Sequence, residues 1–463
     1  MRFLLAGCVL LAAVSLVLPS EPSYDPWAWI VWGREITELG LDTSRGPSWK
    51  PLPVAFTTLF APLEHIDEGL PAAMWLVVAR AGALLAVAMV FRLARRLAGP
   101  GLVTGVAAGV IAAVALVLTP NWLRNMAHGN EAPLAVGLML WAIERHLDGK
   151  RSQALVLAFL GCLLRPEVFP FLAGYGLWLW RAEPGTRRLL VGLAVALPVL
   201  WLVPEWIGSG NPLSAGEQAR NEPPWSLSLK EHPWLAALGR AHDLGGLPLE
   251  LGAVVAVVFA WRERSSPTGR ATVALAVVAV LWIALVTAMT QGGFSGSPRY
   301  FLPAVVIVCV LGAVGAARLV ALVPRAGLAA ALAVVLALAA YPWASEHARG
   351  LPNQATDAQR LAQLQADLGA TVRRAGGPEA VQAYGAPAVN AAFDTRLAWE
   401  AEVPISAVAE SPGDGLIFFS KARKSGRPFR ANLLATVPRT WPGAGRWRIL
   451  SSNPEHAFAL PKG

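Results

Sequence analysis

The stretch Ala271–Met289 reads ATVALAVVAVLWIALVTAM and contains no charged residue in 19 positions. A helix of about 20 apolar residues is long enough to cross the hydrocarbon core of a bilayer. Of the 463 residues in the chain, 55% are hydrophobic and 15% are charged, and the mean hydropathy is +0.48. Average soluble domains carry about 25% charged residues. The composition excludes a disordered chain, argues against a wholly soluble enzyme and favours an integral membrane protein.

Comparable apolar runs recur up to about residue 345. They are Phe3–Leu18, Ala72–Val90, Leu102–Leu118, Ala132–Ile143, Ala154–Leu164, Val168–Trp180, Leu189–Val203, Leu247–Trp261, Ala271–Met289, Phe301–Ala317 and Leu328–Tyr341. We therefore expect a mainly α-helical, polytopic membrane protein with about 11 transmembrane helices. The fourth, fifth and sixth runs reach spanning length only if they include polar residues at their ends.

Charge predicts the orientation, because short cytoplasmic loops are enriched in Lys and Arg. With the N-terminus in the cytoplasm, the five inner loops hold 14 basic residues, and the longer outer loops hold nine. The net charge of +9 therefore arises in short turns, which argues against nucleic-acid binding. If 154–180 formed one kinked helix, everything after it would be reversed. The charge count favours a hairpin with Arg165-Pro166-Glu167 at its outer tip.

Two polar regions are expected outside the cytoplasm. The first outer loop, Pro19–Leu70, is rich in Trp and Pro, and a later outer loop covers Pro204–Gly246. We expect residues 1–343 to form the transmembrane domain and residues 344–463 a small α/β domain. The helices expected in that domain are Asp357–Arg374 and Val389–Trp399, and the strands are Ala380–Tyr384, Gly415–Phe419, Trp447–Leu450 and Ala457–Leu460. Its basic run, Lys421 to Arg430, is either a solvated loop or a contact for anionic lipid or glycan.

Ionisable residues at membrane depth are costly and usually face a cavity or a partner. Such residues gather at the outer ends of the predicted helices: Asp25, His128, Glu131, Arg165, Glu167, Arg299 and Tyr300. They are consistent with one outward-facing cavity. Simpler roles remain open for each, including mutual ion pairs, helix capping and anchoring at the interface. Trp27, Trp29 and Trp32 could form an aromatic belt at the membrane interface. Alternatively, Trp27, Trp29 and Trp49 could stack on the faces of sugar rings.

Short motifs in the same places carry a resemblance to a known family. They are Tyr24-Asp25-Pro26-Trp27-Ala28-Trp29, Trp49-Lys50-Pro51-Leu52-Pro53, Gly129-Asn130-Glu131 with Leu164-Arg165-Pro166-Glu167, and Ser297-Pro298-Arg299-Tyr300-Phe301-Leu302-Pro303. Together with the overall plan, they make the chain resemble the GT-C-type polytopic membrane glycosyltransferases. This broad class includes protein mannosyltransferases and actinobacterial arabinofuranosyl- and mannosyltransferases.

The resemblance implies an inverting hexosyl or pentosyl transfer from a polyprenyl-phosphate carrier to a glycan, lipid or protein acceptor outside the cytoplasm. This reaction would serve cell-envelope assembly in the plasma membrane of a bacterium. An acid of the first outer loop acts as general base in such enzymes, and Asp25 matches that position. Many relatives carry a second acid there; Glu35 and Asp42 are the nearest, and neither is adjacent.

The same resemblance suggests residues for the donor phosphate, since guanidinium groups match phosphate oxygens. Arg299 and Arg165 are the first candidates, with Tyr300 beside them. Lys50, Arg124 and His128 are further candidates, and Glu131 and Glu167 are expected to orient the arginines or bind sugar hydroxyls. A divalent metal such as Mg²⁺ or Mn²⁺ is left open, because the sequence shows no dedicated ligand cluster.

Other classes of protein compete with this interpretation. A secondary transporter would use the same charges, but no internal repeat is visible. A non-catalytic scaffold of envelope assembly could have a similar sequence. Such a protein would be expected to lack the acid of the first outer loop, whereas Asp25 is present here. A lipid-linked oligosaccharide ligase usually has a longer late outer loop than 204–246.

Overall fold

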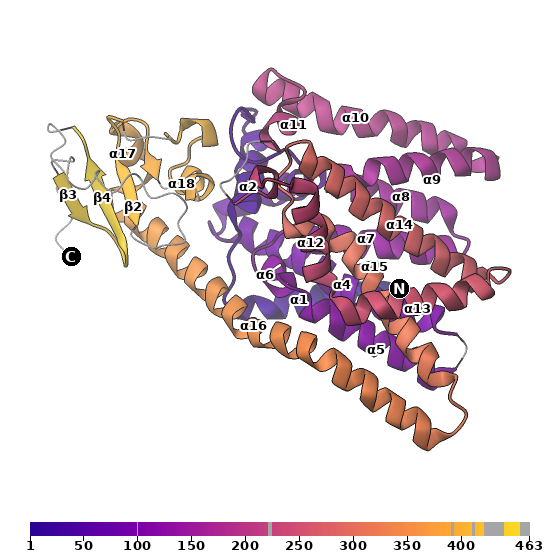
Figure 1. Ribbon diagram of the computed structural model, residues 1–463. Coiled ribbons are helices and arrows are strands. Elements are labelled where there is room, and N and C mark those ends of the chain that lie inside the picture. Colours follow the sequence, from indigo (N-terminus) through magenta and orange to yellow (C-terminus); the bar gives the residue numbers. More distant parts are fainter. Residues whose placement is uncertain (100, 221–224, 390–392, 410–412, 421–438, 454–463) are drawn as a thin grey trace.

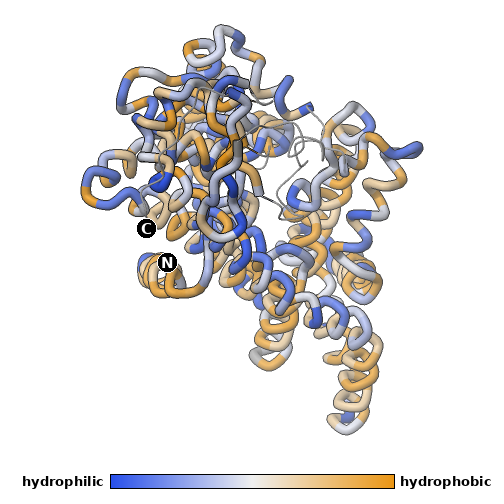
Figure 2. Tube along the Cα trace, turned by 90° about the vertical axis from the view of Figure 1, so that its left-hand side faces the viewer, coloured by the Kyte–Doolittle hydropathy of each residue, from blue (hydrophilic) through white to orange (hydrophobic). Residues whose placement is uncertain are grey.

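The structure is a computed structural model, and it describes all residues except 100, 221–224, 390–392, 410–412, 421–438 and 454–463. Figure 1 shows a bundle of helices from which one long helix, α16, leads to a small domain containing a sheet. In Figure 2 the helices are mostly hydrophobic, and the turns at their ends are mostly hydrophilic. This distribution is the one that a bilayer favours for a helical protein.

Every predicted apolar run forms a helix. These helices are α1 (Arg2–Val14), α4 (Leu70–Leu97), α5 (Leu102–Leu118), α7 (Ala132–Leu147), α8 (Arg151–Cys162), α9 (Phe169–Ala182), α10 (Arg187–Ser209), α13 (Leu247–Arg262), α14 (Pro267–Gln291), α15 (Pro298–Ala321) and α16 (Ala326–Arg374). The chain breaks between α8 and α9 at a 3-10 turn, η3 (Pro166–Val168), and the two helices contact each other. That contact is expected of a hairpin.

Five helices are long and apolar enough to cross a membrane on their own: α4, α10 with its preceding turn (Pro184–Ser209), α14, α15 and α16. A sixth candidate is the pair of α12 (Pro233–Gly245) and α13, which is bent by 87°. The protein therefore has the helices of a multi-pass membrane protein. The number of eleven spans and the cytoplasmic N-terminus stay predictions.

Glycines allow α13 and α15 to pack closely at the centre of the bundle. A Cβ added to Gly315 would lie 1.9 Å from the carbonyl oxygen of Gly252, and one added to Gly312 would lie 2.6 Å from that of Leu249. Small residues at such crossings let two backbones approach, which is how membrane helices gain packing contacts.

We expect Gly315→Ala to destabilise the protein by about 1–3 kcal/mol, because the added methyl group has no room and the two helices must separate. Gly192→Ala is the matched control, since Gly192 lies inside α10 with nothing within 4 Å of the added carbon. The control should be neutral or slightly stabilising, because Ala favours helix. Thermal unfolding in detergent measures both, and equal melting temperatures would contradict the close packing.

The chain between α1 and α4, which includes the predicted first outer loop, is largely helical. It contains η1 (Ser15–Val17), α2 (Tyr24–Thr37), α3 (Pro51–Phe60) and η2 (Ala61–His65). The prediction of an interfacial aromatic belt is wrong, because Trp27, Trp29 and Trp32 are at most 1% exposed and lie in the core. Trp49 is buried as well. Other parts of the protein cover all four rings, so no face of these rings is open to lipid or sugar.

The later outer segment contains short helices: α11 (Ser214–Gln218), η5 (Leu227–Leu229) and the amphipathic α12. A further short helix, α6 (Trp122–Ala127), precedes α7. Helix α16 runs unbroken through the predicted domain boundary between residues 343 and 344. The membrane part and the C-terminal domain therefore share this helix.

In the described part of the C-terminal domain, four strands form a sheet in the order β1-β2-β4-β3. The strands are β1 (Ala388–Val389), β2 (Ile417–Ser420), β3 (Arg439–Pro442) and β4 (Trp447–Ser451), and only β1 and β2 are parallel. Helices α17 (Gly377–Ala383) and α18 (Asp394–Glu400) and the turn η7 (Ile405–Ala407) accompany the sheet. The predicted α/β character, the helix over 357–374 and the strands near 417 and 447 are confirmed.

Two predictions in this domain are wrong. Residues 380–383 belong to helix α17 instead of a strand, since a short apolar run fits both periods and Pro378 lies at the first helical turn. The predicted helix over 389–399 is shorter, because Val389 lies in β1 and α18 begins at Asp394. The predicted strand Ala457–Leu460 and the basic run from Lys421 to Arg430 lie outside the described residues.

Candidate active site

Six ionisable side chains from separate elements meet at one end of the bundle. Asp25 lies in the first turn of α2, and Arg299 in the first turn of α15. Lys50 and Glu131 immediately precede α3 and α7. Arg165 and Glu167 come from the break between α8 and α9. All six belong to the set predicted from the sequence.

Prolines explain why these side chains project from helix ends. Pro51, Pro166 and Pro298 each lie in the first turn of the helix they start, where the missing backbone N–H costs nothing. A residue before proline is driven to an extended conformation. Lys50 and Arg165 accordingly have φ of −142° and −144°. Their long side chains leave the helix axis and reach into the space between helices.

Ion pairs join the cluster in two groups. Arg299 Nη1 donates to Asp25 Oδ2 at 2.6 Å across 274 positions of sequence. Lys50 Nζ pairs with Glu131 Oε1, and Arg165 Nη1 lies 3.7 Å from both Glu131 Oε1 and Glu167 Oε1. Tyr300 lies beside both arginines, with its ring centroid 4.9 Å from the Arg165 guanidinium and 5.8 Å from that of Arg299. Three positive and three negative formal charges balance in the cluster.

Burial separates an interior part of the cluster from an accessible part. The side chains of Glu131 and Arg165 are at most 1% exposed, and that of Glu167 is 3% exposed. Asp25 and Arg299 are 14% and 24% exposed. A ligand would therefore reach the Asp25–Arg299 pair first and the Glu131–Arg165–Glu167 group behind it.

Several buried polar atoms of the cluster have no hydrogen-bond partner in the described part of the chain. The donors are Arg165 Nε and Nη2, Arg299 Nε and Trp29 Nε1; the acceptors are Glu131 Oε2 and Glu167 Oε2. Leaving such groups unsatisfied costs about 1–3 kcal/mol each. A ligand that offers acceptors to the arginines and hydroxyl donors to the carboxylates would satisfy both sets.

Comparison with known proteins identifies the fold. No family model matches the sequence, and no curated protein does. Two solved structures of ArnT from Cupriavidus metallidurans, one bound to undecaprenyl phosphate and one in the apo state, match over 98% of this chain and 98% of theirs, each with a TM-score of 0.56. The identities are 14% and 13%. The chain shares the fold of these two ArnT structures. At this identity the likeness establishes the fold, and the chemistry has to be argued from the side chains.

Two candidates lie outside the cluster. The backbone N–H of Arg124 donates to Gln354 Oε1 at 3.1 Å. His128 Nδ1 lies 3.3 Å from the carbonyl oxygen of Glu21, and its own carbonyl accepts from the Ser23 N–H at 3.0 Å. Among the described residues, neither side chain contacts the cluster. His128 instead holds the segment that leads into Asp25.

The candidate second acids also lie elsewhere. Glu35 Oε2 accepts from the Asp42 N–H at 2.9 Å, and burial raises the pKa of Glu35 to about 8. Asp42 binds Ser44 and Ser406, on the side of the C-terminal domain. Among the described residues, neither acid pairs with the residues of the cluster, whereas Glu131 and Asp25 both act electrostatically on Arg299.

A further set of contacts to the region around Asp25 comes from the C-terminal domain and was not predicted from the sequence. Gln365 and α18 contact the residues on both sides of Asp25. These contacts cross more than 330 positions and involve no motif, so only the folded chain reveals them. Two cavities, of about 310 and 380 Å³, lie at this junction between α2, the start of α4, the end of α16 and α18.

The carboxyl group of Asp394, the first residue of α18, predicts that the stability of the protein depends on pH. Burial raises the pKa of Asp394 to about 7, above the value near 4 of a free aspartate, although its hydrogen bonds and Arg45 oppose the shift. Between pH 4 and 7 the unfolded chain then binds fewer protons than the folded chain at this group, so stability falls as pH rises. We expect the melting temperature to fall from pH 5 to pH 8 and Asp394→Asn to reduce that fall. Asp414→Asn, at an exposed position, is the control; identical slopes in both variants would contradict the prediction.

Proposed function

We propose that this protein is an inverting membrane glycosyltransferase that moves a sugar from a polyprenyl-phosphate carrier to an acceptor outside the cytoplasm. One observation carries the proposal. A partly exposed carboxylate, Asp25, pairs with Arg299 in front of the buried Arg165, and among the described residues the N–H groups Arg165 Nε and Nη2 and Arg299 Nε have no partner and are free for an anion. The fold supports it, since ArnT has the same architecture and was solved with undecaprenyl phosphate.

The proposed chemistry assigns the base to Asp25. The acceptor hydroxyl attacks the anomeric carbon of the sugar, the bond from that carbon to the phosphate oxygen breaks, and the carrier phosphate leaves. An alcohol is a weak nucleophile, and a carboxylate within hydrogen-bond reach can take its proton as the new bond forms. Attack from the face opposite the leaving phosphate inverts the anomeric centre.

The proposed phosphate site consists of Arg299, Arg165 and Lys50. Charge grows on the phosphate as the sugar departs, and fixed positive groups in a dry site stabilise that charge. Guanidinium forks suit phosphate oxygens because they offer two parallel N–H donors. Tyr300 fixes the planes of both arginines from one side.

Glu131 and Glu167 have two parts in this proposal. Their Oε1 atoms lie beside Lys50 and Arg165 and hold them in place. Their unpartnered Oε2 atoms are acceptors for sugar hydroxyls. A site with both free donors and free acceptors fits a sugar phosphate better than a bare anion, since carboxylate oxygens repel phosphate.

The experiment is transfer by purified protein in nanodiscs, with a panel of polyprenyl-phosphate sugars and release of polyprenyl phosphate as the readout. Turnover of one donor supports the proposal and identifies the sugar. Absence of both turnover and binding for every donor would contradict it and favour a scaffold or a transporter. Protease access to the C-terminal domain from one side of sealed vesicles tests the proposed plasma-membrane orientation, with that domain outside the cytoplasm.

The described residues form no group of three or more His, Cys, Asp or Glu side chains arranged to hold a metal ion. The carboxylates of the cluster are already held by arginine and lysine. The proposed reaction therefore uses no metal ion. We expect transfer to continue at an unchanged rate after treatment with EDTA, and recovery of a lost activity by Mg²⁺ or Mn²⁺ would overturn this expectation.

A further inference from the structure

The segment 21–27, which contains the proposed base, is enclosed by the C-terminal domain on one side. Among the described residues, Asp25 itself makes no hydrogen bond or ion pair with the side chains of that domain, whereas residues before and after it do. The contacting side chains are Gln365 of α16 and Asp394, Thr395, Arg396 and Trp399 of α18.

Gln365 binds the segment at two points that flank Asp25. Its Nε2 donates to the carbonyl oxygen of Pro22 at 2.8 Å, and its Oε1 accepts from Trp27 Nε1. The side chain is 2% exposed, so both bonds are shielded from water. One planar amide therefore fixes the distance between the residue three positions before Asp25 and the residue two positions after it.

Thr395 and Asp394 fix the residue next to Asp25. Thr395 Oγ1 donates to the carbonyl oxygen of Tyr24 at 3.0 Å, and the Tyr24 hydroxyl hydrogen-bonds with the Asp394 carboxyl group. Thr395 is 1% exposed. Since Tyr24 opens α2, these bonds set the direction in which the first turn of that helix begins.

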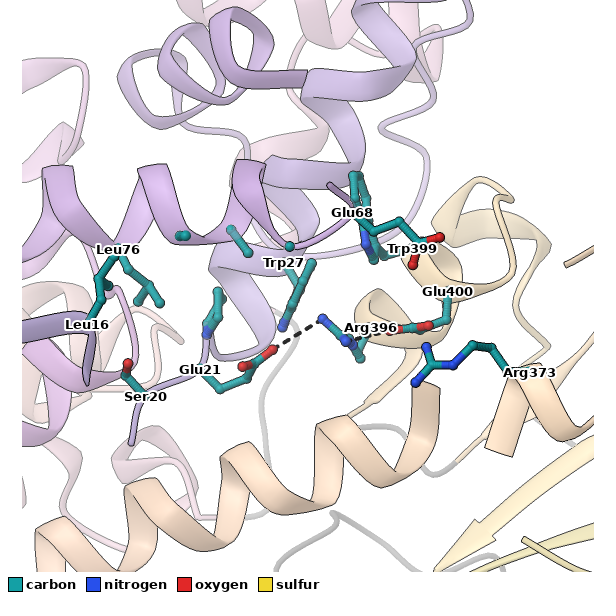
Figure 3. A pocket seen from close by; sticks show the side chains of 14 residues that line it. Leu16, Ser20, Glu21, Trp27, Glu68, Leu76, Arg373, Arg396, Trp399 and Glu400 are labelled. Carbon is teal, nitrogen blue, oxygen red and sulfur yellow. Dashed lines mark hydrogen bonds and ion pairs between the residues drawn. The ribbon is translucent and has the colours of Figure 1, made fainter. Parts of the chain in front are cut away.

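Arg396 completes the enclosure, as Figure 3 shows. Its Nη1 lies 3.2 Å from Glu21 Oε1, its Nη2 pairs with Glu400, and its guanidinium lies 4.1 Å from the ring centroid of Trp27. Trp399 packs against the same indole at 5.9 Å between centroids. The indole of Trp27 is therefore held from several sides by the C-terminal domain.

The membrane part holds the same segment less extensively. Among the described residues, its polar contacts to positions 21–25 come from His128, through Glu21 and Ser23, and from Arg299, through Asp25. Asp25 thus lies where the two parts of the protein meet. Its carboxylate pairs with Arg299 of the cluster, and the C-terminal domain holds the backbone of Pro22 and Tyr24 before it.

We propose that Gln365 and Thr395 are positioning residues, through which the C-terminal domain aims the Asp25 carboxylate at the acceptor hydroxyl. This inference rests on the proposed function and adds that the C-terminal domain is part of the catalytic unit. The physical reason is the steep dependence of reaction on geometry, where a displacement of about 1 Å can cost 100-fold in rate. Donor binding is a property of Arg165, Arg299 and Lys50, so it should not depend on these two residues.

The test uses full-length protein in nanodiscs, with the donor found active in the panel. Gln365→Met and Thr395→Val remove the hydrogen bonds and keep the side-chain volume. We expect kcat to fall about 10- to 100-fold, while the KM for donor and the Kd for polyprenyl phosphate stay within about twofold. Thr395→Ser keeps the hydroxyl and should restore most of the rate. Gln363→Met is the matched control, because Gln363 lies two residues away on the exposed face of α16 and should behave as wild type.

Several outcomes would overturn the proposal: unchanged kcat in both variants, a rise in KM or Kd with unchanged kcat, or an equal loss in Gln363→Met. If Gln365→Met does not fold, Gln365→Glu replaces it, since this variant keeps the acceptor for Trp27 and loses the donor to Pro22. Unchanged kcat in both Gln365→Glu and Thr395→Val would then count against the proposal. An active wild type with normal variants refutes this inference alone. An inactive wild type refutes the proposed function and this inference with it.

Discussion

Asp25→Asn is expected to abolish sugar transfer while the protein still folds and inserts. Asparagine has the same shape as aspartate but cannot take a proton from the acceptor hydroxyl. Loss of a general base costs about 10²–10⁴-fold in rate. The measurement is the initial rate of transfer in nanodiscs beside wild type, and retention of a near wild-type rate would remove Asp25 from the base assignment.

The ion pair of Asp25 with Arg299 makes a second readout necessary. The variant loses this pair, but the pair is partly exposed, so its contribution to stability is small. Binding of polyprenyl phosphate should be equal or tighter, because Arg299 is released and a negative charge near the phosphate is removed. Weaker binding would mean that Asp25 organises the donor site and is not the base.

An equivalent change elsewhere in the first outer segment serves as the control. Asp67 is exposed, and its Oδ1 accepts from the Gly69 N–H at 2.8 Å. Asp67→Asn should therefore leave the transfer rate unchanged, within about twofold. A comparable loss in this control would point to a general effect of charge in the outer segment instead of a specific role for Asp25.

Arg299→Ala is expected to weaken donor binding by about 10- to 100-fold. A hydrogen bond to a charged group contributes about 1.5–3 kcal/mol, and 1.4 kcal/mol corresponds to a factor of ten. The variant also leaves Asp25 without its cationic partner, so the transfer rate should fall as well. The measurement is the Kd for polyprenyl phosphate together with the KM for the donor.

Arg349→Ala is the control for this prediction, since Arg349 is an exposed arginine of α16 distant in sequence from every motif. Arg299→Lys distinguishes charge from geometry, because lysine keeps the charge but offers no planar fork; its affinity should lie between those of wild type and alanine. Equal effects of Arg299→Ala and Arg349→Ala would exclude Arg299 from the phosphate site.

Much of the architecture could be predicted because its causes are local. Each predicted apolar run forms a helix, and Pro166 predicted the break between α8 and α9. The same reasoning placed Asp25, Lys50, Glu131, Arg165, Glu167 and Arg299 together, since all lie at predicted outer helix ends and were therefore expected at one level of the membrane. Their predicted depth in the membrane also placed Arg124 and His128 in that set, but in the structure these two residues make other contacts.

Tertiary structure decided which of these residues touch. The pair of Asp25 with Arg299 depends on how α2 and α15 are placed. The position of α15 includes its close packing on α13 at Gly315, which no hydrophobic period encodes. Tertiary structure also decided that the tryptophans of α2 are buried and that the C-terminal domain holds the base-bearing segment. Hydrophobicity and proline act on the residues beside them, whereas a hydrogen bond across 343 positions forms only when distant elements have packed.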